Sequence, residues 1–217
     1  MPTAITLQHI AVHLAVVALA VTAITATAHE EEKKAASAVL SHSPHFAVIG
    51  RAPDFTLLDT KGQRLQLAQL RGRTVLLAFV YTTCASACPL LSYRMGLLQT
   101  TLADAGAFPA RVAMLSVTVD PARDTAAALA RYAGGFDARP GWYFLRDSPE
   151  RMRPVLHAYD EWTRLRPDGE LDHPARLYLI DPAGRIREIY SLAFFDERQA
   201  FLDILAVDRE ARGVSRK

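Results

Sequence analysis

The chain has 217 residues and half of them are apolar, which is enough for one domain with a full hydrophobic core once a leader and a linker are set aside. Lysine and arginine together number 25 against 23 aspartate and glutamate residues, and like charges form no long block. The length argues against a second independent domain, and the charge balance argues against nucleic acid as a partner.

The first 28 residues predict an export signal. They contain no lysine, arginine, aspartate or glutamate, and the apolar run from Ile10 to Ala26 ends in the small-residue pattern Ala26-Thr27-Ala28. We expect cleavage after Ala28. The alternative is a retained membrane anchor, although the run is short for a spanning helix. Either outcome places the remainder outside the cytoplasm, in a periplasm, as a soluble or inner-membrane-anchored monomer.

Residues 29–50 predict a linker and residues 208–217 a C-terminal tail, on either side of one domain at 51–207. The linker is polar and then mixed in composition, with no sustained period of 2 or 3.6 residues. It contains His29, His42 and His45. We interpret them as solvated linker residues, with a transient copper relay as the alternative.

The first part of the domain predicts a hairpin, a buried strand and a helix. Two β-favouring segments around the turn Asp59–Gly62 predict a β-hairpin from Asp54 to Leu67. The uninterrupted apolar run Thr74–Val80 is typical of a strand that is covered on both faces. Pro89 then suits the first turn of a helix, whose apolar stripe contains Leu91, Met95, Leu98 and Leu102.

The rest of the domain alternates strands with helices, which indicates parallel pairing. In chain order we expect a strand, a helix, a strand, a helix, a hairpin and a helix, at residues 112–119, 125–132, 142–145, 148–159, 176–190 and 196–207. Asp124 is the predicted N-cap of the first of these helices. The fold class is therefore α/β, with an N-terminal β-hairpin and a central mixed sheet flanked by helices.

The two cysteines of the chain lie where the buried strand passes into a helix, in the sequence Tyr81-Thr-Thr-Cys84-Ala-Ser-Ala-Cys88-Pro89. Unpaired backbone N–H groups and a positive dipole at a helix start stabilise thiolates, so we expect a lowered cysteine pKa. Two cysteines are too few for a disulfide scaffold or for an iron–sulfur cluster.

The spacing of the cysteines favours a shared metal ion. Helical residues four apart have Cβ atoms about 5 to 6 Å apart, whereas a disulfide needs about 3.5 to 4.5 Å. Two sulfurs at the wider spacing can converge on one soft ion such as Cu(I) or zinc. A stapling disulfide or a pair of buried free thiols is the structural alternative, because exported cysteines usually pair. A bridge across so short a loop would stabilise the fold little.

A neutral imidazole would complete a trigonal Cu(I) site. Of the seven histidines, two lie in the leader, three in the linker and His157 on a predicted helix face, which leaves His173 in a loop before a strand. Such loops converge near helix starts in sheets of this class. Asp172 could orient the His173 imidazole, and Pro174 restricts the backbone of His173. A solvated loop histidine without a ligand role is the alternative.

Three segments in this order resemble the Sco/SenC family of copper proteins. Cys84-Ala-Ser-Ala-Cys88-Pro89 is similar to the family's Cys-x-x-x-Cys-Pro motif. Ser116–Thr125 resembles its strand-to-helix junction, and Asp172–Arg185 resembles its metal-histidine loop and hairpin. Two positions depart from the family pattern: Ala-Ser-Ala stands where Pro-Asp-Val is common, and Pro174 stands where small hydroxylated residues are usual.

The resemblance implies a thioredoxin-like fold that binds a copper ion, as Cu(I) or Cu(II), through Cys84, Cys88 and His173. It implies a metallochaperone that delivers copper to the copper-bearing subunit of cytochrome c oxidase or reduces that subunit's cysteines. Other copper proteins or thiol-redox proteins are further partners that the resemblance implies. The alternative is a thiol:disulfide oxidoreductase in which Cys84 attacks and Cys88 resolves. A peroxiredoxin-like peroxidase is a further rival, but that family places threonine three residues before its reactive cysteine, where this chain has Tyr81.

Overall fold

The computed structural model describes residues 46–85 and 87–213. The predicted leader, most of the linker and His29, His42 and His45 lie outside these residues. No helix within them is both long and apolar enough to cross a bilayer. The elements in chain order are β1 (Gly50–Arg51), β2 (Thr56–Leu58), β3 (Arg64–Gln66), η1 (Leu67–Leu70), β4 (Thr74–Val80), α2 (Ala87–Asp104), β5 (Val112–Thr118), α3 (Ala126–Gly134), β6 (Trp142–Leu145), α4 (Pro149–Ala158), β7 (Arg164–Leu165), β8 (Leu171–Asp172), β9 (Arg176–Ile180), β10 (Arg185–Ser191), η2 (Leu192–Phe194) and α5 (Glu197–Ala211).

A six-stranded mixed sheet forms the centre of the domain, in the order β1-β10-β9-β4-β5-β6. β4, β5 and β6 pair in parallel, whereas β9 is antiparallel to β4 and β10 is antiparallel to β9. Every residue of β4 and β5 is buried, which explains why both strands are unbroken apolar runs in the sequence. The predicted central mixed sheet is therefore confirmed.

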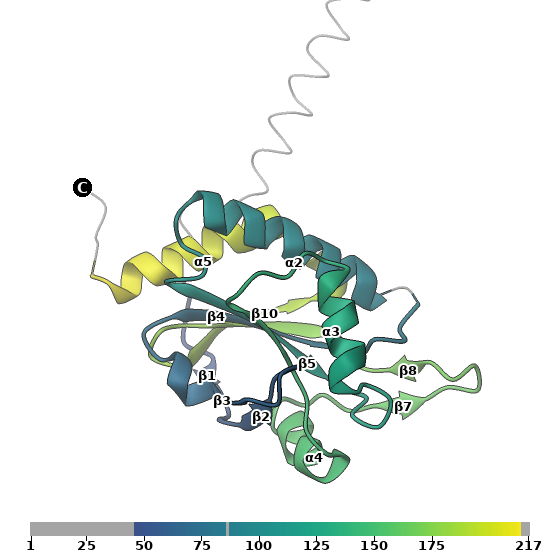
Figure 1. Cartoon of the computed structure of the whole chain (residues 1–217). Helices are drawn as coiled ribbons and strands as arrows, with labels where there is room; N and C mark the ends of the chain where they lie inside the picture. Colours follow the sequence, from purple (N-terminus) through teal and green to yellow (C-terminus); the bar gives the residue numbers. More distant parts are fainter. Residues whose placement is uncertain (1–45, 86, 214–217) are drawn as a thin grey trace, which may run out of the picture. The chain divides into compact units, whose positions relative to one another are not determined.

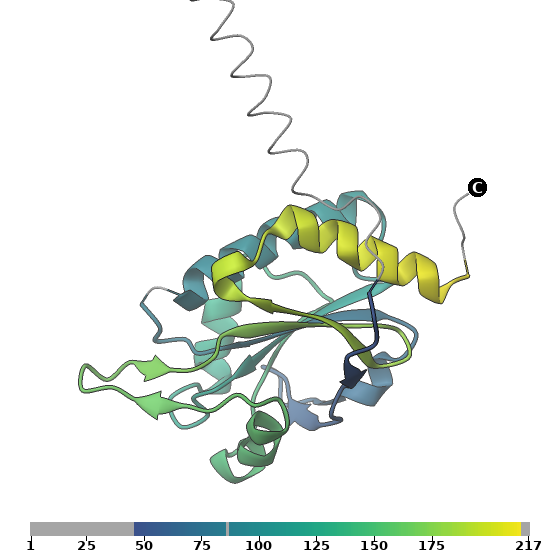
Figure 2. The ribbon, with the colours of Figure 1, turned by 180° about the vertical axis from the view of Figure 1, so that it is seen from behind.

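Helices and a hairpin cover the two faces of this sheet (Figure 1, Figure 2). α2 and α5 pack together over one face. α3 joins them, because the Tyr132 hydroxyl of α3 lies 2.9 Å from Ser92 Oγ of α2. α4 and the β2–β3 hairpin lie on the opposite face, where the rings of Tyr159 and Phe55 meet edge-on with centroids 6.2 Å apart.

The predicted hairpin, strands and helices are present, with small differences at their ends. β2 and β3 pair antiparallel, as expected for residues 54–67. α5 continues to Ala211, beyond the expected end at residue 207. The short β7–β8 pair has no counterpart among the predicted elements, because strands of two residues are too short to show an alternating pattern.

Asp124 is not the N-cap of α3, contrary to the prediction. The Thr125 hydroxyl fills that position and accepts a hydrogen bond of 3.1 Å from the Ala128 backbone N–H. Asp124 is completely buried and accepts hydrogen bonds from Thr82 and Thr118 instead. Because threonine is itself a good N-cap residue, α3 does not need Asp124, which holds the segment that leads to the cysteines.

Candidate metal centre

The two cysteines lie at the junction between β4 and α2. β4 ends at Val80, and Cys88 is the second residue of α2. Cys84 Sγ accepts a hydrogen bond of 3.3 Å from the Cys88 backbone N–H, one of the groups that a helix start leaves without an intrahelical partner. Cys84 and Cys88 are 8% and 2% exposed, and no disulfide joins them. The structure therefore contains the reduced form of a buried pair.

The pKa of the Cys88 thiol lies well above its usual value. The largest cause is the hydrogen bond with the Cys84 side chain, and burial adds to it. The expectation of a lowered pKa at the helix start is therefore wrong for Cys88, because the neighbouring sulfur and the loss of solvation outweigh the helix dipole. Any metal ion that binds Cys88 as a thiolate must displace this proton.

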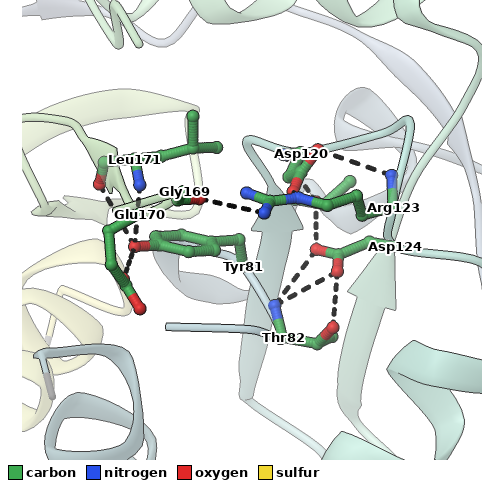
Figure 3. A network of polar contacts seen from close by, with 9 residues as sticks. Tyr81, Thr82, Asp120, Arg123, Asp124, Gly169, Glu170 and Leu171 are labelled. Carbon is green, nitrogen blue, oxygen red and sulfur yellow. Dashed lines mark hydrogen bonds and ion pairs between the residues drawn. The ribbon is translucent and has the colours of Figure 1, made fainter. Parts of the chain in front are cut away.

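A buried aspartate fixes the backbone between β4 and the cysteines. Both carboxylate oxygens of Asp124 lie 3.2 Å from the Thr82 backbone nitrogen, and the Thr82 hydroxyl donates to one of them at 2.6 Å (Figure 3). The other oxygen accepts a hydrogen bond from the hydroxyl of Thr118, the last residue of β5. Asp124 therefore ties the ends of two parallel strands together two residues before Cys84.

His173 follows β8 and approaches the cysteines from a distant part of the chain. His173 Nε2 lies 4.0 Å from Cys88 Sγ, across 85 positions of sequence. The His173 side chain is only 4% exposed, which does not fit a solvated loop histidine. The structure thus brings Cys84, Cys88 and His173 together, and their role as metal ligands stays a prediction.

Glu161, and not Asp172, contacts the imidazole of His173. Glu161 Oε2 lies 3.3 Å from His173 Nδ1. Asp172 pairs with Arg164 at 2.6 Å instead. Successive residues of an extended segment point to opposite sides, so the sequence neighbour of His173 is poorly placed to reach its ring. The prediction that Asp172 orients His173 is therefore wrong, and no motif in the sequence marks Glu161 for this place.

Tyr81 links the end of β4 to the β7–β8 hairpin. Its hydroxyl hydrogen-bonds the Glu170 carboxylate and lies 3.2 Å from both the backbone oxygen and the backbone nitrogen of Leu171 (Figure 3). Its ring meets the His173 ring edge-on, with centroids 5.9 Å apart. Burial and the bond to Glu170 raise the pKa of Tyr81, which keeps the hydroxyl protonated. The residue that departs from the peroxiredoxin pattern therefore positions the histidine segment.

Arg123 makes a second link to the same hairpin. Its guanidinium forms an ion pair with Asp120 and donates a hydrogen bond of 3.0 Å to the Gly169 carbonyl (Figure 3). The bond to Asp120 raises the pKa of Arg123. The junction after β5 thus contacts both halves of the site, because Asp124 holds the cysteine segment while Arg123 holds the histidine hairpin.

A hollow of 330 Å³ opens onto this site, and its lining includes Cys84, His173 and Trp162. A larger hollow of 520 Å³ beside α4 is lined by Glu161 and by His157, which is exposed on its helix as predicted. No cysteine of the described ranges lines the larger hollow. We therefore assign the thiol and imidazole chemistry to the hollow of 330 Å³.

The two cysteine sulfurs and the imidazole nitrogen lie near one another, but they are not arranged as the ligands of a bound ion. Within the part of the chain that the structure describes, no three His, Cys, Asp or Glu side chains are already spaced to hold a metal. Two sulfurs and an imidazole nitrogen can bind a soft metal ion. Alternatively, two adjacent thiols can exchange with a disulfide of another protein.

Comparison with known proteins identifies the family of the chain. Residues 50–206 match the SCO1/SenC family. The mitochondrial SCO2 homolog of Bos taurus is 36% identical over 153 residues, which cover 68% of this chain and 56% of the relative. The chain thus spans little more than half the length of the mitochondrial relatives that it matches.

Solved structures share the fold. Bradyrhizobium japonicum ScoI, described with copper bound, is 27% identical with a TM-score of 0.63, over 72% of this chain and 99% of that one. BsSco is 23% identical with a TM-score of 0.64, over 76% of this chain and 97% of that one, a likeness that concerns the fold alone. These neighbours confirm the predicted thioredoxin-like fold. Together with the match over residues 50–206, they show that the chain belongs to the SCO1/SenC family.

Proposed function

We propose that this chain binds one Cu(I) ion through Cys84 Sγ, Cys88 Sγ and His173 Nε2 and delivers it during assembly of the copper centre of cytochrome c oxidase. The observation that carries the proposal is the 4.0 Å separation of His173 Nε2 and Cys88 Sγ. Two relatives support it: ScoI was solved with copper bound, and BsSco is described as a member of a family of cytochrome c oxidase assembly proteins.

The donor set and its spacing fit such an ion. Thiolates and imidazole are preferred ligands of Cu(I). With bonds of about 2.3 Å to sulfur and about 2.0 Å to nitrogen, as in zinc sites, a sulfur and a nitrogen ligand of one trigonal or tetrahedral ion lie about 3.5 to 3.7 Å apart. The observed 4.0 Å between His173 and Cys88 requires closure by only a few tenths of an ångström.

The burial of the three side chains suits transfer of copper as cargo. Cys88 is enclosed, whereas Cys84 and His173 line the 330 Å³ hollow. A thiolate of the acceptor protein that enters there can bind the ion as one of these ligands leaves. This ligand exchange leaves the oxidation state of copper unchanged, and it is not a catalytic cycle. The acceptor is then a protein with its own cysteines, and the predicted leader would place the encounter in the periplasm.

Chelator competition on the whole chain tests this ligand set. We expect the unmodified protein to retain one Cu(I) per chain, and Cys84→Ala, Cys88→Ala and His173→Ala each to lose it. His157→Ala is the matched control, because His157 is exposed on α4 and has no place in the site. Full retention of Cu(I) by all three site variants would defeat the assignment.

One observation favours a second candidate, a thiol:disulfide oxidoreductase. Cys84 is more exposed than Cys88 and lines the open hollow. As a thiolate it would attack a partner's disulfide and release one partner thiolate, and Cys88 would displace the second, which leaves the partner reduced and Cys84–Cys88 oxidised. A reduction potential well above about −300 mV together with weak Cu(I) binding would favour this activity.

A further inference from the structure

Glu161 is a buried carboxylate whose main contact is the imidazole of His173. The residue is 1% exposed, and its Oε2 lies 3.3 Å from His173 Nδ1. Its Oε1 is buried and has no hydrogen-bond partner among the described residues. A carboxylate removed from water is costly unless it is paired. The contact with His173 therefore compensates for much of the cost of burying Glu161.

The turn after α4 fixes the position of Glu161. Asp160 has a left-handed φ of 53°, a conformation that residues other than glycine rarely adopt. The Glu161 backbone N–H donates a hydrogen bond of 2.8 Å to the Leu156 carbonyl, as in the Schellman motif that ends many helices. Arg176 donates to the Asp160 carbonyl at 3.1 Å. The backbone on the N-terminal side of Glu161 is thus held before any metal arrives.

Two groups compete for Nδ1 of His173. The Ala175 backbone N–H, a donor, lies 3.2 Å from Nδ1, and the Glu161 carboxylate is an acceptor. A neutral imidazole carries its proton on Nδ1 or on Nε2. It accepts from Ala175 in the second tautomer and donates to Glu161 in the first. Only the Nδ1–H tautomer leaves a lone pair on Nε2, the atom that faces Cys88.

We propose that Glu161 is a positioning residue that stabilises the Nδ1–H tautomer of His173 and so presents Nε2 to the metal ion. The inference rests on the proposed function, which gives Nε2 the ion. Glu161 acts through the imidazole and does not touch the metal. In metal sites of this kind, loss of the carboxylate behind a histidine ligand typically weakens metal binding by about 10- to 100-fold.

The metal-free protein provides the most selective test. ¹⁵N NMR of the His173 ring distinguishes the two neutral tautomers without copper. We expect Glu161→Leu to lower the Nδ1–H fraction, because the acceptor is lost while the Ala175 N–H remains. Glu161→Gln keeps the size of the side chain, and its amide can pair with either tautomer. We therefore expect this variant to lower the Nδ1–H fraction as well, but by less than Glu161→Leu does.

Asp172→Asn is the matched control for these variants. It removes a carboxylate next to His173 in sequence that pairs with Arg164 and not with the imidazole. We expect the tautomer ratio of this variant to equal that of the unmodified protein. A change in the tautomer ratio as large as that of Glu161→Leu would overturn the proposal, because any nearby carboxylate, and not Glu161 in particular, would then set the tautomer of His173.

Cu(I) affinity completes the test. We expect Glu161→Leu to bind Cu(I) about 10- to 100-fold more weakly in chelator competition, and Glu161→Gln to lie between it and the unmodified protein. An unchanged tautomer ratio or an unchanged affinity in both Glu161 variants would overturn the proposal. Retention of Cu(I) by His173→Ala would instead contradict the proposed function, and the metal-free tautomer measurement would still report on Glu161.

Discussion

The two sides of the candidate metal centre are held by different kinds of interaction. Cys84 follows β4, every residue of which is buried, and Cys88 lies in the first turn of the long helix α2. His173 follows a hairpin of two-residue strands on which Leu165 is 68% exposed. Fully buried strands and the buried carboxylate of Asp124 place the cysteines, whereas partly exposed ion pairs and hydrogen bonds hold the histidine hairpin.

This difference predicts which property a substitution on each side changes. Segments with few buried apolar contacts open at a lower free energy than the core, so we expect the hairpin to adjust more readily than the cysteine segment when an ion binds. Substitutions beside the cysteines are therefore expected to change the free energy of unfolding. Substitutions beside the histidine are expected to change metal affinity while the fold stays stable.

The largest expected effect is on the cysteine side, at Asp124. Asp124→Ala removes a buried charged acceptor from Thr82 and Thr118, which is expected to lower the free energy of unfolding by about 3 kcal/mol. Urea denaturation of the metal-free protein measures it. Asp168→Ala, at a half-exposed position of the hairpin, is the control, with a change within about 0.5 kcal/mol. Equal losses in the free energy of unfolding at the two positions would contradict the difference between the cysteine side and the histidine side.

Tyr81→Phe probes the link between the two sides. The variant keeps the ring against His173 and removes the hydroxyl that contacts Glu170 and Leu171. We expect a loss of about 1 kcal/mol in the free energy of unfolding. We also expect faster hydrogen exchange at the Leu171 amide, while the amides of β4 stay protected. Equal acceleration in β4 would show that the hairpin is not a separate unit.

Arg123→Ala gives the smallest expected effect on stability and separates stability from affinity. Its ion pair with Asp120 is partly exposed, so the free energy of unfolding is expected to change by less than about 1 kcal/mol. The lost bond to Gly169 frees the histidine hairpin, so Cu(I) affinity is expected to fall by about tenfold. Chelator competition and urea denaturation of the same sample measure both. An unchanged Cu(I) affinity would show that Arg123 does not help to position the histidine hairpin for metal binding.

Sequence patterns predicted the features that depend on local chemistry. The strands Thr74–Val80 and Val112–Thr118 are continuous apolar runs, and a run of this kind leaves few alternatives to burial. Cys84, Cys88 and His173 stood out because the chain has two cysteines and one histidine in a suitable loop. Their proximity in the fold agrees with the prediction.

The supporting residues could not be predicted in the same way, because their roles depend on distant parts of the chain. Asp124 precedes a helix and therefore has the pattern of an N-cap, yet its partners are Thr82 and Thr118. Glu161 belongs to a helix-ending turn, and nothing local indicates that His173 packs against it. A sequence neighbour such as Asp172 was the more obvious choice and points elsewhere.

X-ray absorption spectroscopy of the Cu(I)-loaded protein tests the central claim most directly. Two sulfur ligands at about 2.3 Å and one nitrogen ligand at about 2.0 Å per copper are expected, taking the bond lengths of zinc sites as a guide. The nitrogen contribution is expected to disappear in His173→Ala. A spectrum with sulfur ligands alone, or one that His173→Ala leaves unchanged, would contradict the assignment of Cys84, Cys88 and His173 to one ion.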